Sequence, residues 1–173
     1  MRYRIADIDD LHSLIALYKA VARTEDGIAR LEYEVTEDYV KDFLLKSLAS
    51  GLIIVGENPD DETQLIASVH AYKKGIKVFD HVLGDMTLVV HPQFQGKKIG
   101  RTIFTIFLEE IGRNRLDVGK VELIARESNT KAIALYQSLG FLVEGRMEMR
   151  IKTTHDDYEA DIPMGWRNPN YEL

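Results

Sequence analysis

Apolar residues recur at helical spacing in four separate segments of the chain. The clearest case is the segment 98–113, where Ile99, Ile103, Phe107 and Ile111 fall on one face of a helix. Three other segments show the same period of about 3.6 residues in a weaker form. The spacing therefore predicts helices at 7–22, 36–50, 98–113 and 129–140.

Polar residues and glycines mark the ends of these predicted helices. Asp7, followed three residues later by Asp10, is a candidate N-terminal cap, and Thr36 is another. Gly51 and Gly140 stand where helices commonly end, because glycine adopts the left-handed conformation of that position without strain. These end signals agree with the periodicity and support the helix predictions.

Runs of β-branched and alternating apolar residues occupy much of the remaining chain. They predict strands at 2–6, 51–57, 64–74, 81–91, 120–126, 141–152 and 158–166. A turn is expected at 153–157, and the polar stretch 23–34 is expected to form a loop with irregular helical turns. Strands and helices mixed in this order indicate an α/β fold with a central sheet covered by helices.

The composition is that of a soluble globular protein. The chain has 173 residues, of which 45% are hydrophobic and 29% charged. We expect one domain over residues 1–166 and a short C-terminal tail over 167–173. No apolar run approaches the roughly 18 residues of a membrane span, and the N-terminus is too polar for a signal peptide. A cytoplasmic location and no membrane partner are therefore expected.

Charge and residue usage exclude several classes of function. The net charge of −6 argues against nucleic acid as a partner, because phosphate backbones are bound by basic surfaces. The chain has no cysteine, which excludes disulfides, thiolate zinc sites and cysteine nucleophiles. Its histidines lack the paired spacing of metal ligands, so no metal site is expected.

One turn of this acidic chain is strongly basic. Residues 91–104 contain no acidic residue and directly follow an apolar run. The segment carries three cations and two glycines, namely Lys97, Lys98, Arg101, Gly96 and Gly100. A strand, a glycine turn and a helix in this order direct unpaired backbone N–H groups toward one point, where phosphate or pyrophosphate binds. An ordinary turn with solvated lysines would share these local features. The Walker and dinucleotide-binding glycine patterns are absent.

Two motifs resemble those of the GNAT superfamily of acetyl-CoA-dependent N-acetyltransferases. The first is the family's Q/R-x-x-G-x-G/A loop, matched by Gln95 and Gly100 but with Lys98 in place of the middle glycine. The second, N-x-x-A-x-x-L-Y-x-x-x-G-F, is matched at Asn129, Ala132, Leu135, Tyr136, Gly140 and Phe141. The opening residues 4–18 also resemble the family's first strand and helix, so the resemblance extends over about residues 2–166.

The resemblance implies both a fold and a reaction. The implied fold is the GNAT-type acyl-CoA N-acyltransferase fold, a central mixed, mostly antiparallel sheet of about seven strands flanked by about four helices. The implied reaction transfers the acetyl group of acetyl-CoA, a cosubstrate, to a primary amine by direct attack, without a covalent enzyme intermediate. The acceptor would be an amine-bearing small molecule or a protein or peptide, no metal is needed, and a homodimer is left open.

The resemblance also implies where acetyl-CoA binds. In the family the pantetheine arm pairs with the backbone of the fourth strand, and the pyrophosphate lies on N–H groups of the glycine loop. The expected cofactor-binding residues are Leu88, Val89, Val90, Gln95, Gly96, Lys97, Lys98, Ile99, Gly100, Arg101, Asn129 and Ala132.

Two residues of the second motif have alternative interpretations. Asn129 either caps a helix or contacts the cofactor arm, and both are compatible because they use different atoms. Tyr136 is, by resemblance, the catalytic acid that reprotonates the departing thiolate, since a phenol with an ordinary pKa near 10 is protonated at neutral pH. The alternative for Tyr136 is a half-buried aromatic side chain on an amphipathic helix.

The catalytic base is the hardest role to assign. Asp85, near the fourth strand, is the candidate, because family members often use a carboxylate there or a water relay. The alternative for Asp85 is a solvent-facing residue at the start of a strand. His81 and Glu127 are other candidate bases, His70 could line the cleft, and His91 is more typical of a turn.

Two further functions compete with acetyl transfer. One is a non-catalytic acyl-CoA-binding regulatory module on the same fold, since fold does not guarantee chemistry. Tyr136 and the otherwise intact loop favour the enzyme, whereas the missing middle glycine at Lys98 and the unassigned base leave room for the module. The other is a phosphate-binding domain unrelated to CoA. The acceptor itself is left open, because its pocket would come from loops such as 23–35 and from the last hairpin.

Overall fold

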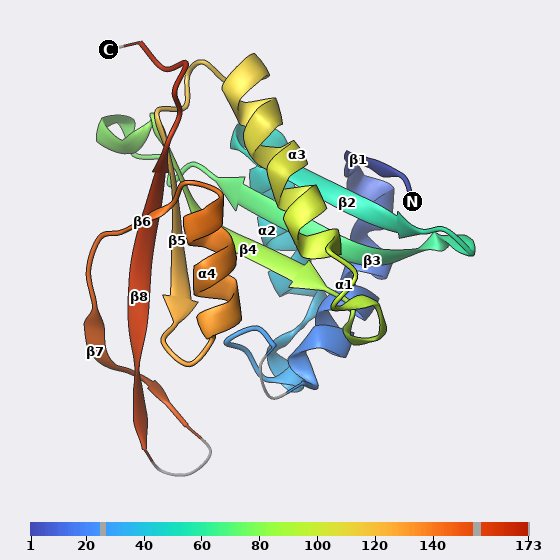
Figure 1. Cartoon of the computed structure of the whole chain (residues 1–173). Helices are drawn as coiled ribbons and strands as arrows, with labels where there is room; N and C mark the ends of the chain where they lie inside the picture. Colours follow the sequence, from blue (N-terminus) through green and yellow to red (C-terminus); the bar gives the residue numbers. More distant parts are fainter. Residues whose placement is uncertain (25–26, 154–156, 173) are drawn as a thin grey trace.

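A single mixed sheet forms the centre of the computed structural model, which describes residues 1–24, 27–153 and 157–172. Neighbouring strands follow the order β1-β2-β3-β4-β5-β8-β6, and β7 also pairs with β8 (Figure 1). The strands are β1 (Tyr3–Ile5), β2 (Leu52–Asn58), β3 (Asp61–Tyr72), β4 (Val82–Val90), β5 (Lys120–Arg126), β6 (Leu142–Val143), β7 (Met147–Lys152) and β8 (Tyr158–Arg167). The helices are α1 (Leu11–Ala22), α2 (Glu37–Ser50), α3 (Ile99–Asn114) and α4 (Thr130–Ser138).

The sheet is mostly antiparallel, as expected, and β4 and β5 form its parallel pair. The strand predicted at 141–152 is two strands. Val143 pairs with Met164, whereas Met147 pairs with Asp161, so four steps along this segment face three steps of β8. The extra residue breaks the pairing between β6 and β7. Of the turn expected at 153–157, residues 154–156 lie outside the described residues.

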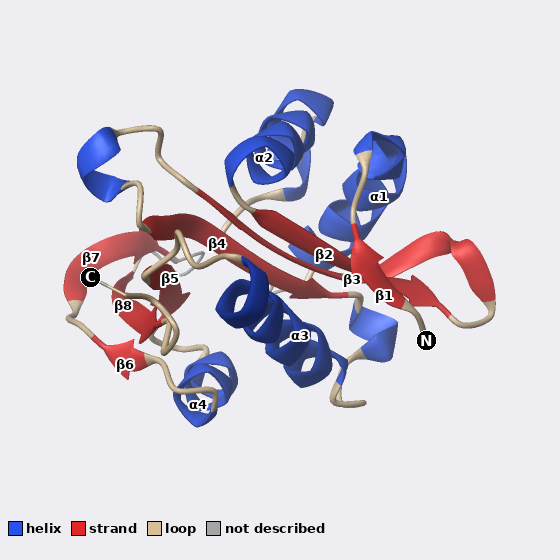
Figure 2. Ribbon diagram, turned by 90° about the horizontal axis from the view of Figure 1, so that it is seen from above, coloured by secondary structure: helices blue, strands red, loops and turns tan. Residues whose placement is uncertain are grey.

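Helices cover both faces of the sheet, which agrees with the helical periodicity. Figure 2 shows α1 and α2 on one face and α3 and α4 on the other. Leu14 and Leu17 of α1 and Phe43 of α2 are buried in a core that these helices share with β2 and β3. The apolar stripe of α3, which includes Ile103 and Phe107, is buried in the second core on the opposite face.

The predicted helix ends are confirmed with one shift and one difference. Gly51 follows α2 as expected, but with φ of −131° and ψ of −141° it does not adopt the left-handed conformation. Asp7 and Asp10 form the expected capping box, but it caps a 3-10 turn over Ile8–Asp10 that precedes α1. The Thr36 side chain accepts a hydrogen bond from the Tyr39 N–H at the start of α2. Gly140 follows α4 with φ of +93°, the left-handed conformation that glycine favours.

The sheet opens between β4 and β5, and this opening positions the site. The two strands pair only at Val82–Lys120 and Leu83–Val121, and beyond these pairs they diverge (Figure 1). A bulge in β4 contributes to this divergence. Between Gly84 and Thr87, β4 has one residue more than the segment of β3 that faces it. Asp85 lies in this bulge with φ of +50°.

The residues after β8 pack onto the end of α3. The Asn168 side-chain amide donates a hydrogen bond to the Val118 carbonyl at 2.8 Å. The Asn170 amide donates to the Gly112 carbonyl at 2.8 Å. Much of the segment expected as a tail is therefore hydrogen-bonded to the body of the fold. No helix within the described ranges combines the length and apolar character needed to cross a membrane.

Candidate active site

Three adjoining cavities occupy the opening between β4 and β5. The loop cleft, of about 520 Å³, lies beside the glycine loop and α4. The middle cavity, of about 250 Å³, shares Leu88 and Tyr136 with the loop cleft. The far cavity, of about 330 Å³, lies between β3, β4 and β5 beneath α2, and shares Tyr39 and Thr87 with the middle cavity. The shared walls make one path from the glycine loop through the sheet opening.

The loop cleft brings together most of the residues singled out from the sequence. Those that line it are Leu88, Val89, Val90, Gln95, Gly96, Lys98, Ile99, Gly100, Arg101, Asn129, Ala132 and Tyr136. Two others lie elsewhere. The Lys97 ammonium stacks over the Phe94 ring, with its nitrogen 5.0 Å from the ring centroid. Asp85 lines the far cavity.

The glycine loop presents a row of unpaired backbone donors. Within the described residues, the consecutive N–H groups from Gly96 to Arg101 have no hydrogen-bond acceptor, and the first satisfied donor is Thr102, bonded to the Lys98 carbonyl at 3.0 Å. No described carboxylate pairs with Lys98 or Arg101. Six free donors at a helix N-terminus, with unpaired cations beside them, are the arrangement that binds a phosphate group.

Lys98, which stands where the family motif has its middle glycine, adopts a backbone conformation that glycine favours. Its φ of +62° and ψ of 9° lie in the left-handed region, immediately before α3. A non-glycine residue there carries about 1–2 kcal/mol of conformational strain. The substitution removes no donor, because a backbone N–H is available from any residue except proline. The departure from the family motif therefore changes a side chain and leaves the row of donors intact.

Side-chain hydrogen bonds hold the walls of the loop cleft. The Gln95 amide donates to the Val90 carbonyl at 3.2 Å, which ties the loop to the end of β4. Arg101 donates to the Ser138 hydroxyl at 2.7 Å and joins α3 to α4. The Asn129 carbonyl oxygen caps α4 by accepting from the Ala132 N–H at 3.1 Å. Capping uses the oxygen of Asn129 and leaves its amide nitrogen available toward the cleft.

Tyr136 lies where the loop cleft meets the middle cavity. Its half-buried ring packs edge-on against Phe104, with the centroids 5.5 Å apart, and also contacts Phe141. No hydrogen bond to a described protein group engages its hydroxyl. Burial raises the pKa of Tyr136 to about 12, so the phenol is protonated throughout the neutral range. The side chain thus presents a fixed proton donor to the cavities.

The edge of β4 that faces the opening is unpaired. Beyond Leu83, β4 pairs with β3 on one side and has no described strand partner on the other. The outward backbone N–H and C=O groups between Asp85 and Val90 therefore face the cavities. An extended ligand chain can pair with such an edge as an added strand would.

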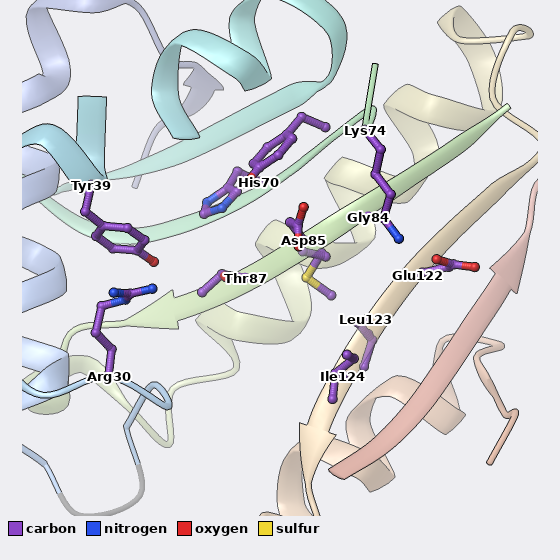
Figure 3. Close-up of a pocket in the computed structure, with 12 residues that line it drawn as sticks. Arg30, Tyr39, His70, Lys74, Gly84, Asp85, Thr87, Glu122, Leu123 and Ile124 are labelled. Carbon is purple, nitrogen blue, oxygen red and sulfur yellow. The ribbon is translucent and has the colours of Figure 1, made fainter. Parts of the chain in front are cut away.

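The far cavity collects charged and aromatic side chains from α2, β3, β4 and β5 and from two loops. Figure 3 shows Asp85 on β4 between Lys74 at one end and Arg30, stacked beside Tyr39, at the other. His70 contributes the wall on β3, and Glu122 and Ile124 stand on β5. This cavity can accept a small polar molecule next to the middle cavity.

The other candidate bases lie in different places. His81 is exposed before the start of β4 and stacks on Tyr171, with ring centroids 6.3 Å apart. Glu127 pairs with Arg146 beyond the end of β5. His91 begins the turn before α3, where its ring nitrogen accepts from the Gln93 N–H. Asp85 is the predicted base that lines a described cavity, and His70, which was expected to line the cleft, lines the same one.

His70 is buried, and its protonation should control stability in acid. Its Nδ1 lies 2.9 Å from the Tyr18 hydroxyl, and its ring stacks on Phe43 with centroids 4.1 Å apart. Burial lowers the pKa of His70 from 6.5 to about 3. The unfolded chain therefore binds this proton more tightly than the folded chain does. Neutral His70 contributes its full stability above pH 6.5, and that contribution is lost as the pH falls toward 3.

We expect the free energy of unfolding to drop by about 1.4 kcal/mol per pH unit from this group alone below about pH 6. Urea unfolding of the wild type and of His70→Gln at pH 7, 6, 5 and 4 measures the effect. The variant should be less stable at pH 7 but lose stability less steeply in acid. Equal slopes for the two proteins would show that His70 does not titrate in this way.

Several residues at the site carried no recognisable signal in the sequence. Arg30, Tyr39 and Thr87 line both the middle and the far cavities, and Lys74 lines the far cavity. The sequence indicated one of them indirectly, because the loop 23–35 was expected to build the acceptor pocket and Arg30 belongs to that loop. Within the described part of the chain, no cluster of three or more His, Asp or Glu side chains could hold a metal ion.

Comparison with protein families identifies the class. The model described as Acetyltransferase (GNAT) family matches residues 12–141, which is more than half of the chain and includes both motifs. The protein therefore belongs to the GNAT acetyltransferase family. A comparison with curated protein sequences finds no match.

Solved structures show the same fold over nearly the whole chain. The yncA protein of Salmonella typhimurium, solved with its cofactor acetyl-CoA, is 20% identical, covers 100% of this chain and 96% of its own, and has a TM-score of 0.82. A phosphinothricin acetyltransferase of Sinorhizobium meliloti in complex with acetyl-CoA is 16% identical, and the match covers 98% of this chain and 89% of that chain with a TM-score of 0.84. A ribosomal-protein-alanine N-acetyltransferase of Brucella melitensis is 23% identical, and the match covers 96% of this chain and 99% of that chain with a TM-score of 0.80. At such identities the likeness establishes the fold, and the expected mixed α/β fold is confirmed.

Proposed function

We propose that this protein is an N-acetyltransferase, formed by a single domain over residues 1–166, that transfers the acetyl group of acetyl-CoA to a primary amine. The observation that carries the proposal is the continuity of the site. Six free N–H donors from Gly96 to Arg101 adjoin an unpaired strand edge, and both open onto the cavity that contains Tyr136. A diphosphate joined to an extended polar arm that ends in a reactive group matches this series of features.

The residues present fit acetyl-CoA. The pyrophosphate would lie on the N–H groups of residues 96–101, with Lys98 and Arg101 supplying charge. The pantetheine arm would pair with the backbone of Leu88, Val89 and Val90. Asn129 would offer its amide nitrogen to the arm, while Ala132 and Ile99 shape the wall. Acetyl-CoA supplies an acetyl group activated as a thioester, and the work of the chain is to hold and orient it beside an amine.

Tyr136 and Asp85 have separate roles in this proposal. Tyr136 holds a proton on its phenolic oxygen and donates a hydrogen bond toward the sulfur, where negative charge develops. With a pKa of about 12, it keeps its own proton more firmly than a thiol of ordinary pKa near 8.5, so hydrogen bonding is its main contribution. Asp85 accepts the proton of the amine. Because Asp85 lines the far cavity and not the middle one, the proton would pass through a bridging water.

Thermal unfolding with acetyl-CoA tests the binding step. We expect acetyl-CoA at about 100 times its dissociation constant to add roughly 2.7 kcal/mol, or about 5 °C or more in Tm for a chain of this size. Thiol release with a panel of primary amines then tests transfer. Stabilisation without any thiol release would favour a regulatory acyl-CoA-binding module. No stabilisation of folded protein at millimolar acetyl-CoA would contradict the proposal.

A further inference from the structure

The far cavity contains charges that the protein itself does not neutralise. Arg30, Lys74 and Asp85 line it, and none of the three forms an ion pair with a described residue. A fourth charged side chain, Glu122, lies 3.0 Å from the Lys120 ammonium nitrogen, which also pairs with Glu144 at 2.8 Å. The charges of the described groups that line the far cavity therefore balance. The middle cavity differs, because its described charged lining residues are Arg126, which pairs with Glu159 at 2.8 Å, and Arg30, which has no counter-ion. A partly desolvated cation without a counter-ion favours a ligand that supplies an anion.

Arg30 is held in a position to bind such an anion. Its guanidinium carbon lies 3.8 Å from the centroid of the Tyr39 ring, which fixes the plane of the group by cation–π stacking. Stacking uses the face of the guanidinium, and no described carboxylate pairs with the N–H donors on its edges. The N–H groups on one edge of a guanidinium can donate two parallel hydrogen bonds to the two oxygens of a carboxylate. A lysine ammonium cannot reproduce this geometry.

The two unpaired cations stand at different distances from the reacting end of the site. Arg30 lines the far cavity (Figure 3) and also the middle cavity, which Leu88 and Tyr136 line as well. Lys74 lines only the far cavity and lies over Gly84 near the start of β4, where an added Cβ would be 3.7 Å from Lys74 Cε. An anion bound to Arg30 is therefore next to the amine that reacts in the middle cavity, and an anion bound to Lys74 is not.

We propose that the acceptor is a small α-amino acid, a primary amine with a carboxylate on the adjacent carbon, and that Arg30 binds this carboxylate. The rest of the molecule extends into the far cavity toward Asp85. A simple amine or polyamine would bring only positive charge next to Arg30, whose own charge has no described counter-ion. This inference rests on the proposed acetyl transfer. In that transfer the acceptor nitrogen bonds to the acetyl carbon, the carbon–sulfur bond breaks, and one proton from the nitrogen ends on the thiol.

The test compares each L-amino acid with its own C-terminal amide, and adds the diamine putrescine. Thiol release from acetyl-CoA gives kcat and KM for wild type, Arg30→Met and Lys74→Met. We expect the best amino acid to exceed its amide at least about tenfold in kcat/KM, because the amide lacks the charge-assisted pair. Arg30→Met should raise KM for the acid by a similar factor and leave KM for the amide and for acetyl-CoA unchanged. Lys74→Met removes the same charge from the same cavity and should keep the preference for the acid.

A second readout separates this inference from the acetyl transfer on which it rests. The shift in Tm caused by each amino acid is measured in the presence of free CoA, where no transfer occurs. The inference is overturned, while acetyl transfer stands, if amides or putrescine turn over as well as the acids do. The same holds if Arg30→Met lowers kcat/KM equally for an acid and its amide. An Arg30-dependent Tm shift by acids without any turnover would support the inference and reject acetyl transfer. Neither a shift nor turnover would reject both.

Discussion

Replacing Tyr136 with phenylalanine should lower kcat by about 10²-fold or more, the usual scale for losing a hydrogen-bond donor to charge that develops in the transition state. The ring would keep its contacts with Phe104 and Phe141, so the change removes only the hydroxyl. The affinity for acetyl-CoA should stay nearly constant, because the lost interaction strengthens only as charge develops on the sulfur. Burial raises the pKa of Tyr136 to about 12, so the ratio of wild-type to variant kcat should be the same at pH 7 and at pH 9.

The matched control is Tyr171→Phe, which removes a phenolic hydroxyl at the opposite end of β4, where Tyr171 stacks on His81. Its kcat should equal that of the wild type. Stopped-flow thiol release and acetyl-CoA binding must be measured separately, because kcat and affinity carry different information. If Tyr136→Phe instead loses about 1 kcal/mol of stability and keeps its activity per folded molecule, Tyr136 is a packing residue.

Gly100→Asp should reduce acetyl-CoA affinity by at least about 10²-fold, because the new carboxylate would face the pyrophosphate at close range. The fold should survive. A Cβ at Gly100 would lie 3.5 Å from Val90 and 3.9 Å from Leu88, which are ordinary contacts. An aspartate in the first turn of α3 also interacts favourably with the helix dipole. Gly96 is a poorer position for this test, since its φ of +76° would strain any side chain.

Two companion variants separate charge from size at this position. Gly100→Ala adds one methyl group and should cost little affinity, while helix propensity raises stability by up to about 1 kcal/mol. Gly100→Asn has the shape of aspartate without its charge and should fall between the two. Isothermal titration with acetyl-CoA measures all three, and circular dichroism confirms folding. Equal losses for Asn and Asp would show that crowding acts rather than charge, and full affinity in Gly100→Asp would place the anion elsewhere.

Local patterns in the sequence were sufficient for most elements and for the glycine loop. The strand predicted at 120–126 is observed with the same bounds as β5, and the apolar face of α3 is buried as its spacing indicated. The loop at 95–101 was recognisable because a strand end, a glycine turn and a helix start are adjacent along the chain. Such features depend on interactions within a few residues, which the sequence records directly.

The break between β6 and β7 was not predictable in the same way. The segment 141–152 alternates as a single strand would, and only its pairing with β8 reveals the extra residue between Val143 and Met147. Register between strands depends on the partner strand, and no partner is visible in a local pattern. The same limit applies to the bulge at Asp85, which exists only relative to β3.

The sequence by itself determined the family and the loop that suits a diphosphate, while the tertiary structure alone decided which cavity each side chain faces. Asp85 and Leu88 are three residues apart in the chain, yet they line the far cavity and the loop cleft respectively. The bulge and the separation of β4 from β5 divide them. Arg30 comes from a loop without periodicity and reaches Tyr39 only because α2 packs over the sheet beside it. Contacts between segments distant in sequence form only when the whole chain packs, and the acceptor side of this site is made of such contacts.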